Sequence, residues 1–584
     1  MFKLLKKLSK KEFSLIGAVV ILTCTQTWLD LTMPDYMSEI TMLVQTENSK
    51  MNEILQAGGK MLLCALGSLL ISVVVCFIAA KIASNFSFIV RSKLFSKVMG
   101  FSMNEINNFS TASLITRTTN DITQVQMFLV MGMQMLIKAP ITAVWAIVKI
   151  ANKNTTWTIV TGVSVVVLLS IVTIVLSLAI PRFKRMQILT DNINRVAREH
   201  LDGLNVVRAY NAEEYQSVKF EKANTEITNN SLFASRAMSF LMPTIQMISS
   251  GLVLAIYLVG AVMINDAIGM DKMHLFSDMV VFSAYAMQVI MSFMMLVIVF
   301  MLQPRASVAA KRINEVLSTK SSVISGKTKE FNNEKKGEIE FKNVCFKYPD
   351  GEDYTLKDIT FTAKQGEVVA FIGSTGCGKS TVVNLVPRFY DVTEGEVLVN
   401  GVNVKDYDKE TLNNMIGYVS QKSILFTGDI KSNIMFGENG KPENKENINT
   451  AIDISKSKEF VEDLDKGINS YVAQGGKNFS GGQKQRLSIA RAIYRNPEIF
   501  IFDDSFSALD YKTDRELRET LNERCKNSTR IIVGQRIGTI RDADKIIVLE
   551  DGEIVGMGTH NELLSNCDVY KQIALSQLSE EELA

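Results

Sequence analysis

Six long apolar runs in the first three hundred residues place the strongest constraint on the fold of this chain. Each run approaches or exceeds the roughly 18 to 25 apolar residues that a helix needs to cross a bilayer. We therefore predict six membrane-spanning helices, at residues 13–37, 61–86, 128–150, 157–181, 241–264 and 276–302. At 584 residues, the chain is also too long for a single compact core.

Basic side chains indicate which ends of these spans face the cytoplasm. Lysines cluster ahead of the first run, at Lys3, Lys6, Lys7, Lys10 and Lys11. The segment 181–240 holds further arginines and lysines, whereas the loop 265–274 has one lysine against two aspartates. The positive-inside rule therefore predicts a multi-pass membrane protein whose N-terminus lies in the cytoplasm. A signal peptide is the alternative, but the run continues through Trp28 and Pro34 without a small-residue cleavage site.

Composition argues against several other classes of protein. The formal charge is only +2 and basic residues do not interleave with aromatic ones, so no nucleic-acid partner is predicted. The seven cysteines share no CxxC spacing, which argues against a disulfide framework or a zinc site. The histidines are His200, His274 and His560, so few positions can supply an imidazole.

The second half of the chain alternates short apolar strands, glycine turns and charged helices, as α/β domains do. The stretch between the two halves is rich in lysine, asparagine and glutamate, which is typical of a polar linker. We predict a transmembrane domain at 1–317, a linker at 318–336 and an α/β domain at 337–584.

One motif in the α/β domain predicts nucleotide binding. The run Gly373-Ser374-Thr375-Gly376-Cys377-Gly378-Lys379-Ser380 is a GxxxxGK[ST] phosphate loop. A buried strand is predicted before it at 367–372, and a helix after it from Thr381, so the loop amides can point at phosphates. Lys379 would place its charge on the β and γ phosphates of ATP, and Ser380 its hydroxyl on Mg²⁺. A glycine turn without a ligand is the alternative.

Two further motifs belong to the same chemistry. The predicted strand Ile499-Phe500-Ile501-Phe502-Asp503 ends in a carboxylate that can hold a hydrated Mg²⁺ beside a phosphate loop, although a structural turn aspartate is possible. The run Ser480-Gly481-Gly482-Gln483 combines a hydroxyl with two glycines. At a helix N-terminus, such a run lets an anion approach bare backbone amides closely.

Together these motifs resemble the ATP-binding cassette (ABC) transporters, and six spans followed by one cassette resemble an ABC exporter half-transporter. The resemblance covers the whole chain and implies a dimer in which the signature, Ser480 to Gln483, serves the other subunit's ATP. It further implies adenine stacking by Tyr348, a place for Gln421 between the Mg²⁺ site and the membrane domain, and coupling of the two sites by Ser507-Ala508-Leu509-Asp510. The runs Thr119-Asn120-Asp121 and Val206-Val207-Arg208-Ala209-Tyr210-Asn211 are similar to the two cytoplasmic loops that contact the cassettes.

The chain departs from the family pattern at the position of the attacking water. Where hydrolysing subunits have a glutamate after Asp503, this chain has Asp504, and Gln535 replaces the switch histidine. Gln474 also replaces a common glutamate ahead of the signature. With the phosphate loop, Asp503 and the signature intact, this pattern resembles the degenerate-site subunit of a heterodimeric exporter. The partner would then be a second half-transporter with a competent glutamate and histidine, and the alternative is a homodimer with slow hydrolysis.

The membrane half carries residues that could contact cargo. Methionines and aromatics line the sixth run, at Met279, Met287, Met291, Met294, Met295, Met301, Phe282, Tyr285, Phe293 and Phe300. Such side chains can repack around small amphipathic compounds, which predicts multidrug-type export, although helix packing is the simpler interpretation. Lys138 lies inside the third run, where it could contact cargo or snorkel to the interface. Asp30 and Asp35 are predicted near the outer end of the first span, capping it or lining its exit.

Two other classes of function stay open. Lipids, peptides or thiols could be the cargo of an exporter with this organisation. A regulatory membrane subunit, in which ATP occupancy gates a partner and no cargo passes, is also compatible with the motifs.

Overall fold

The computed structural model describes residues 10–46, 49–151, 154–268, 270–437 and 444–578, so Lys3, Lys6 and Lys7 lie outside the described residues. The chain divides into two compact units. We call them the membrane unit, which comprises Met1–Lys97 and Ala112–Ser318, and the α/β unit, which comprises Val98–Thr111 and Thr319–Ala584.

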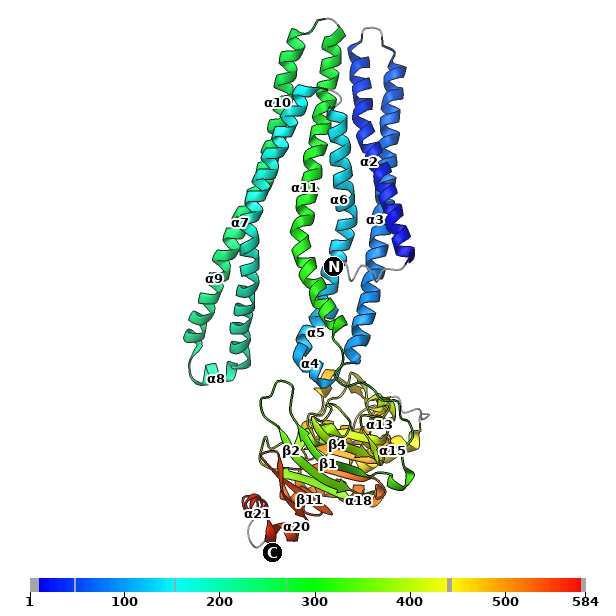
Figure 1. The fold of residues 1–584 in the computed structure, drawn as a ribbon, viewed down its shortest axis with the longest axis vertical. Coiled ribbons are helices and arrows are strands. Elements are labelled where there is room, and N and C mark those ends of the chain that lie inside the picture. The colour runs from blue at the N-terminus through cyan, green and yellow to red at the C-terminus, as the bar shows by residue number, and fades with distance from the viewer. Residues whose placement is uncertain (1–9, 47–48, 152–153, 269, 438–443, 579–584) are drawn as a thin grey trace. The chain divides into compact units, whose positions relative to one another are not determined.

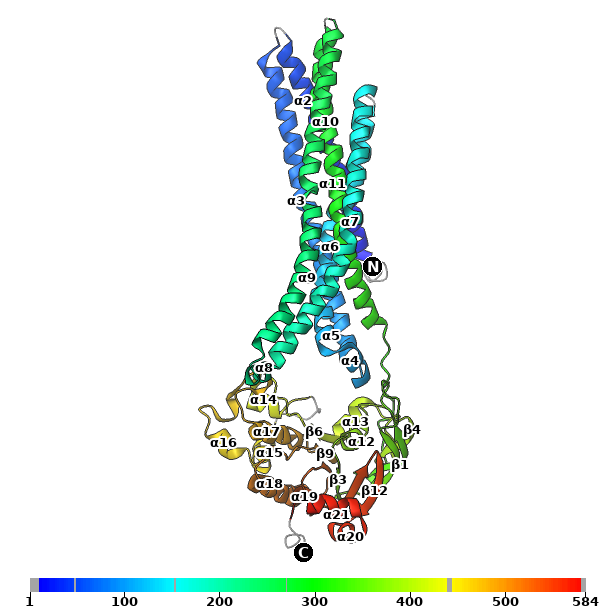
Figure 2. The same cartoon turned by 90° about the vertical axis from the view of Figure 1, so that its left-hand side faces the viewer.

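The membrane unit consists mainly of long helices, as Figures 1 and 2 show. Its helices are α2 Lys10–Gln45, α3 Met51–Met99, α5 Thr111–Thr118, α6 Asn120–Ala151, α7 Thr155–Asp202, α8 Leu204–Ala209, α9 Glu213–Ser239, α10 Leu241–Asp266 and α11 Met270–Ser318. The described residues contain six helical stretches long and apolar enough to cross a membrane, with α5 and α6, and α9 and α10, each counted as one. Each predicted apolar run lies within one of these stretches, so the six spans are confirmed.

The core of the membrane unit lies around α11, which packs against α2, α6 and α10. Trp157 and Phe282 are fully buried there with ring centroids 5.3 Å apart. A Cβ on Gly260 would lie 2.5 Å from the sulfur of Met279. The glycine therefore allows α10 to approach α11 closely, as small residues do between membrane helices.

The α/β unit is built on two main sheets. The four-stranded sheet has the order β2-β1-β4-β5 and the six-stranded sheet the order β12-β11-β3-β10-β9-β6. The strands are β1 Ile339–Phe346, β2 Leu356–Ala363, β3 Val368–Gly373, β4 Glu394–Val399, β5 Val402–Asn403, β6 Ile416–Val419, β7 Gly428–Asp429, β8 Tyr471–Val472, β9 Ile499–Asp503, β10 Thr529–Val533, β11 Lys545–Glu550 and β12 Glu553–Gly558. The helices are α4 Met103–Phe109, α12 Lys379–Leu385, α13 Lys409–Met415, α14 Ile430–Ile434, α15 Lys445–Ile454, α16 Lys458–Glu462, α17 Gly481–Tyr494, α18 Tyr511–Arg524, α19 Ile537–Ile540, α20 His560–Asn566 and α21 Asp568–Leu575. The predicted α/β fold of this half is confirmed.

Parallel pairing brings the motif-bearing strand ends to one edge of the six-stranded sheet. Strands β9 and β10 are buried along their whole length, as expected of parallel strands covered on both faces. Val533 of β10 pairs with Phe371 of β3 on one side and with Asp503 of β9 on the other. The phosphate loop after β3 and the carboxylate of Asp503 therefore meet at the carboxyl edge of the sheet, where ligands bind in open α/β sheets.

Helix α4 groups with the α/β unit although it lies between α3 and α5 in the chain. The Glu105 carboxylate accepts hydrogen bonds from the backbone and hydroxyl of Ser102, at 3.0 and 2.6 Å, and so closes a capping box. It also accepts the backbone N–H of Ser322 at 3.0 Å, and Asn107 donates to the Tyr390 hydroxyl at 3.3 Å. Burial opposes the ionised form of Glu105, but these hydrogen bonds hold the pKa of its carboxyl below the usual value.

Candidate nucleotide site and membrane pocket

The phosphate loop joins the end of β3 to α12. Gly378 caps α12 with φ of +101°, and a Cβ there would lie 2.7 Å from Leu356, so both backbone and packing require glycine. Gly376 has φ of +90° and nothing within 4 Å of a Cβ, so this side of the loop is open. The buried Lys379 ammonium donates to the Gly373 and Ser374 carbonyls at 2.9 and 2.7 Å. The loop thus presents backbone amides and a lysine, a donor set that fits phosphate oxygens.

Ser380 and Asp503 form the part of the site suited to a cation. The Ser380 hydroxyl donates to one Asp503 oxygen at 2.8 Å, and the Tyr418 hydroxyl lies 3.5 Å from the other. Burial raises the pKa of the Asp503 carboxyl, while the Ser380 hydrogen bond and the Lys379 charge oppose that shift. A hydroxyl beside a buried carboxylate fits Mg²⁺, which prefers oxygen ligands and would favour the ionised form. Sequence reasoning missed Tyr418, which no motif marks and which reaches Asp503 because β6 pairs with β9.

Tyr348, predicted to stack on adenine, lies beside the helix that follows the phosphate loop. Its hydroxyl is 3.1 Å from the Thr381 hydroxyl. Its ring packs edge-on against Phe346 and Tyr390, with centroids 4.8 and 5.3 Å away. The side chain is half-buried, so stacking on a base stays a prediction.

The position after Asp503 shows how the two departures from the family pattern meet. Asp504 has φ of +47°, in the left-handed region that aspartate adopts more readily than most residues. Its Oδ2 accepts the Gln535 side-chain amide at 2.9 Å and the Gln421 amide at 3.3 Å. Burial raises the pKa of the Asp504 carboxyl, while the Gln421 hydrogen bond and the Lys379 charge lower it. One carboxylate oxygen of Asp504 therefore accepts hydrogen bonds from both glutamines. Gln421 bonds to Asp504 rather than to Asp503, the predicted Mg²⁺ ligand.

A further residue, Gln577, fixes the backbone around Gln535. Its side-chain oxygen accepts the N–H of Ile537 and its amide donates to the carbonyl of Gln535, both at 2.8 Å. Gln577 follows α21, so the C-terminal helices position the loop that carries Gln535. Sequence reasoning missed this contact because no motif surrounds Gln577. His560 is buried, and its Nδ1 lies 2.7 Å from the Tyr570 hydroxyl.

The signature run begins α17, as its composition predicts. Ser480 caps the helix: its hydroxyl accepts the N–H of Gln483 at 3.3 Å, and the Gln483 side chain accepts the N–H of Ser480 at 2.9 Å. A Cβ on Gly482 would lie 3.2 Å from the carbonyl of Ala508, so the run Ser507 to Asp510 packs against the signature. Ser480 is exposed, and among the described residues no hydrogen bond joins 480–483 to the loop 373–381.

Comparison with known proteins decides the family. The ABC transporter transmembrane region matches residues 16–301, and the ABC transporter domain matches residues 356–507. A Mycobacterium tuberculosis protein, named as an uncharacterized ABC transporter ATP-binding protein, is 37% identical over 89% of this chain and 87% of its own length. The chain belongs to the ABC transporter family.

Other relatives agree with an exporter half-transporter. The ABC transporter ATP-binding protein YfiB of Bacillus subtilis is 34% identical over 86% of each chain. The ATP-dependent lipid A-core flippase of Pseudomonas aeruginosa is 29% identical over 86% of this chain and 82% of its own. A bacterial Atm1-family ABC exporter solved with ATP bound has the same fold, with a TM-score of 0.81, 21% identity, and coverage of 98% and 99% of the two chains. The protein is thus a multi-pass ABC exporter subunit with an ATP-binding cassette, and bacterial relatives support the plasma membrane as its location.

The two predicted coupling loops of this transporter occupy different surroundings. The run Val206 to Asn211 contains the end of the short helix α8, and Val206 and Tyr210 are exposed. The run Thr119 to Asp121 joins α5 to α6, where the buried Asp121 carboxylate pairs with Arg312 of α11 at 3.3 Å. Both runs lie in the membrane unit, and their contact with cassettes stays a prediction.

Lys138 and the two aspartates of the first span join helices of the transporter to one another. Lys138 of α6 pairs with Asp30 of α2 at 2.9 Å, so its ammonium is directed at a neighbouring helix. Lys149 pairs with Asp35 at 2.6 Å, and Asp35 accepts the Tyr285 hydroxyl at 2.6 Å. The interpretation of the aspartates as caps is wrong, because α2 continues to Gln45 and their carboxylates bond to α6 and α11 instead.

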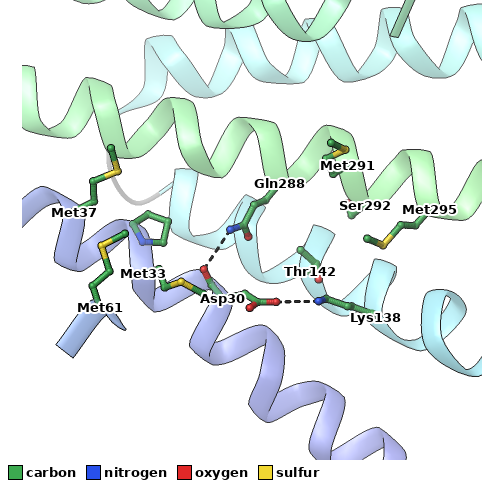
Figure 3. A pocket seen from close by; sticks show the side chains of 11 residues that line it. Asp30, Met33, Met37, Met61, Lys138, Thr142, Gln288, Met291, Ser292 and Met295 are labelled. Carbon is green, nitrogen blue, oxygen red and sulfur yellow. Dashed lines mark hydrogen bonds and ion pairs between the residues drawn. The ribbon is translucent and has the colours of Figure 1, made fainter. Parts of the chain in front are cut away.

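A pocket of about 330 Å³ surrounds the Asp30–Lys138 pair (Figure 3). Its lining residues are Asp30, Met33, Pro34, Met37, Met61, Lys138, Thr142, Gln288, Met291, Ser292 and Met295. Of the predicted cargo stripe on α11, Met291 and Met295 line the pocket, whereas Met279, Phe282 and Tyr285 are buried in the helix-packing core. Part of the stripe therefore serves helix packing and part of it lines the pocket, and contact with cargo stays a prediction.

Proposed function

We propose that this chain is one subunit of a heterodimeric ATP-driven exporter, and that its own nucleotide site binds ATP with Mg²⁺ but hydrolyses it slowly. Its signature, from Ser480 to Gln483, completes the competent site on the partner's phosphate loop. The observation that carries this proposal is the arrangement at Asp504, where one carboxylate oxygen is held by Gln421 and Gln535.

The side chains around Asp504 are poorly suited to activating water. Aspartate is one methylene shorter than glutamate, which retracts the carboxylate by about 1.5 Å, an error that can reduce the rate on the order of a hundredfold. One of the two carboxylate oxygens already accepts two amide N–H groups, which makes the carboxylate a weaker base. Gln535 is neutral at every pH, so it cannot supply the cationic contact of an imidazole to a γ-phosphate.

The binding groups, in contrast, are in place. Lys379 and the loop amides would hold the phosphates, and Ser380, Gln421 and, through water, Asp503 would hold Mg²⁺. The metal when bound neutralises phosphate charge. This chain's residues therefore position ATP and close the loop around it without supplying an effective base.

Isolated chain and pair differ sharply under this proposal. We expect the purified chain alone to hydrolyse ATP at roughly a hundredth or less of the rate of the chain co-expressed with a half-transporter encoded beside it. The measurement is phosphate release in lipid nanodiscs at equal cassette concentration. Robust turnover by the isolated chain, with the partner rigorously absent, would show a working homodimer instead.

For cargo, we propose small amphipathic compounds, which the pocket of Figure 3 could receive. Vesicle uptake by the purified pair tests this, with a lipid, a peptide and a thiol as competing cargoes. ATP turnover without uptake of any of them would favour a regulatory membrane subunit.

Long retention of ATP in this subunit is a second expected result. Lys379→Ala should shorten retention at least about tenfold by removing the phosphate charge contact, yet slow turnover by the pair only several-fold because the chemistry resides in the partner. The measurement is photo-crosslinking of labelled azido-ATP, assigned to each subunit after a chase. Lys512→Ala is the matched control, since the Lys512 side chain is 86% exposed on α18. If labelled nucleotide leaves this subunit as fast as it leaves the partner, the predicted retention of ATP is wrong.

A further inference from the structure

A proline in α2 determines how Gln288 is oriented in the membrane pocket. Pro34 has no N–H, so the Asp30 carbonyl, one turn earlier, loses its helical hydrogen bond. The Gln288 side-chain amide of α11 donates to this carbonyl at 3.3 Å. Because the N–H side of the amide is committed to Asp30, the oxygen side of Gln288 has to face elsewhere (Figure 3). A neighbouring helix commonly satisfies a backbone group that a membrane proline frees.

Three polar groups of the pocket have unused hydrogen-bonding capacity. The Gln288 side-chain oxygen and the Thr142 hydroxyl are buried and have no partner among the described residues. Thr142 itself is only 9% exposed. It lies one helical turn after Lys138 on the same face of α6. The Lys138 ammonium has three N–H groups, and its hydrogen bond to Asp30 uses one of them.

The unused groups combine donors with an acceptor. Lys138 and Thr142 can donate, Thr142 can also accept, and the Gln288 side-chain oxygen can only accept. A charged ligand group would meet a pair that is already neutral, because Asp30 is satisfied by Lys138 and by the Ser68 hydroxyl. A cation could reach Asp30 only by displacing Lys138 and leaving its ammonium unpaired, which is costly away from water.

The remaining walls are apolar and adaptable. Met33, Met37, Met61, Met291 and Met295 line the pocket, and flexible thioethers adjust to ligands of different shape. The volume of about 330 Å³ is at the lower end of the range of small-molecule pockets. A ligand that fits is therefore small and mostly hydrocarbon, with one polar group.

We propose that this pocket binds uncharged amphipathic molecules, with the apolar body among the methionines and a single hydroxyl or amide group hydrogen-bonded to Lys138, Thr142 and Gln288. The inference rests on the proposed export function and specifies its substrate class. It excludes permanently charged lipophilic cations as good ligands of this site.

Binding of two matched probes tests the proposal on the full chain in lipid nanodiscs. Tritiated pyrenebutanol is compared with tritiated pyrenebutyltrimethylammonium by scintillation proximity, with empty nanodiscs subtracted. We expect saturable binding of the alcohol and at least about tenfold weaker binding of the cation. Thr142→Val and Gln288→Leu should each weaken binding of the alcohol by about two- to tenfold.

Thr142→Val separates a binding role from a structural one. Valine keeps the shape, and the hydroxyl it removes has no partner among the described residues, so the Tm should stay equal or rise while binding weakens. Gln288→Leu removes the hydrogen bond to the Asp30 carbonyl and could destabilise the chain. Thr142→Val keeps the test decisive in that case. Thr173→Val is the matched control, because its exposed hydroxyl on α7 already donates to the Leu169 carbonyl at 2.7 Å.

Two outcomes would overturn the proposal: pyrenebutanol binding to Thr142→Val within twofold of the parent, or binding of the cation as tight as that of the alcohol. The assay needs neither ATP nor a partner subunit. Failure of the pair to export would therefore refute the proposed function while leaving this binding result intact. Failure of the binding test would refute the proposed pocket while leaving the export function intact.

Discussion

Ser480→Arg in this chain is expected to abolish ATP turnover by the assembled pair, whereas Asp504→Ala is expected to cost only a few-fold. The arginine would place a long cationic side chain at the start of α17, in the space where the partner's nucleotide is proposed to lie, and would remove the hydroxyl that caps the helix. The Asp504 side chain is shorter than that of a glutamate, and its carboxylate already accepts hydrogen bonds from two glutamines, so its removal should lower the ATPase rate only slightly. Steady-state phosphate release by each assembled pair measures both effects.

Loss of a helix cap alone has to be separated from loss of the signature. Thr559→Arg is the matched control, because Thr559 caps α20 in a capping box with Glu562 and is exposed, as Ser480 is. Losing such a cap destabilises a protein by about 1 kcal/mol, which does not stop catalysis. Equally severe losses for Ser480→Arg and Asp504→Ala would mean that Asp504 is catalytic.

The second large effect is a gain. The double variant Asp504→Glu with Gln535→His should raise ATP turnover by the isolated chain by about ten- to a hundredfold, because it extends the carboxylate by about 1.5 Å and restores an imidazole. The backbone at Asp504, with φ of +47°, suits aspartate better than glutamate, so part of the gain will be offset by strain. Phosphate release by the chain alone is the measurement.

The control for this gain is Asp504→Gln with Gln535→His, which has the same side-chain length without the charge. It should stay as slow as the parent chain. If the double variant with glutamate also stays slow, the cause of weak hydrolysis lies outside these two positions, and the proposal of a degenerate site loses its physical basis.

Local sequence patterns located the strands and helices that carry the nucleotide motifs. Strand β9 matches the predicted strand at Ile499 to Asp503, and β3 is shifted by one residue from its predicted start. Buried parallel strands produce short apolar runs bounded by glycines or charges, and these runs are readable without any partner. Apolar length likewise located the membrane helices, but not their full extent: α7 runs on to Asp202 because its polar continuation still forms a helix outside the apolar run.

Contacts between distant segments were beyond such patterns. Lys138 and Asp30 lie 108 residues apart, and either could have paired elsewhere, so the ion pair became visible only in the folded chain. The meeting of Gln421 and Gln535 at Asp504 is of the same kind, since three loops have to converge on one oxygen. Gln577 carries no motif at all, and its role depends on where α21 ends.

Pro34 in the first span also constrains which substitutions this chain can accept during evolution. Pro34 leaves the Asp30 carbonyl of α2 without its helical hydrogen bond, and Gln288 of α11 donates to that carbonyl instead. A substitution of either residue therefore changes the hydrogen bonding of the other. In a homologue without this proline, the backbone N–H of residue 34 could bond to the Asp30 carbonyl. The Gln288 amide would then be available to hydrogen-bond to a ligand in the pocket. If the pocket binds the proposed ligands, covariation between these two positions would accompany changes in which molecules it binds, although the two residues are joined by a backbone hydrogen bond.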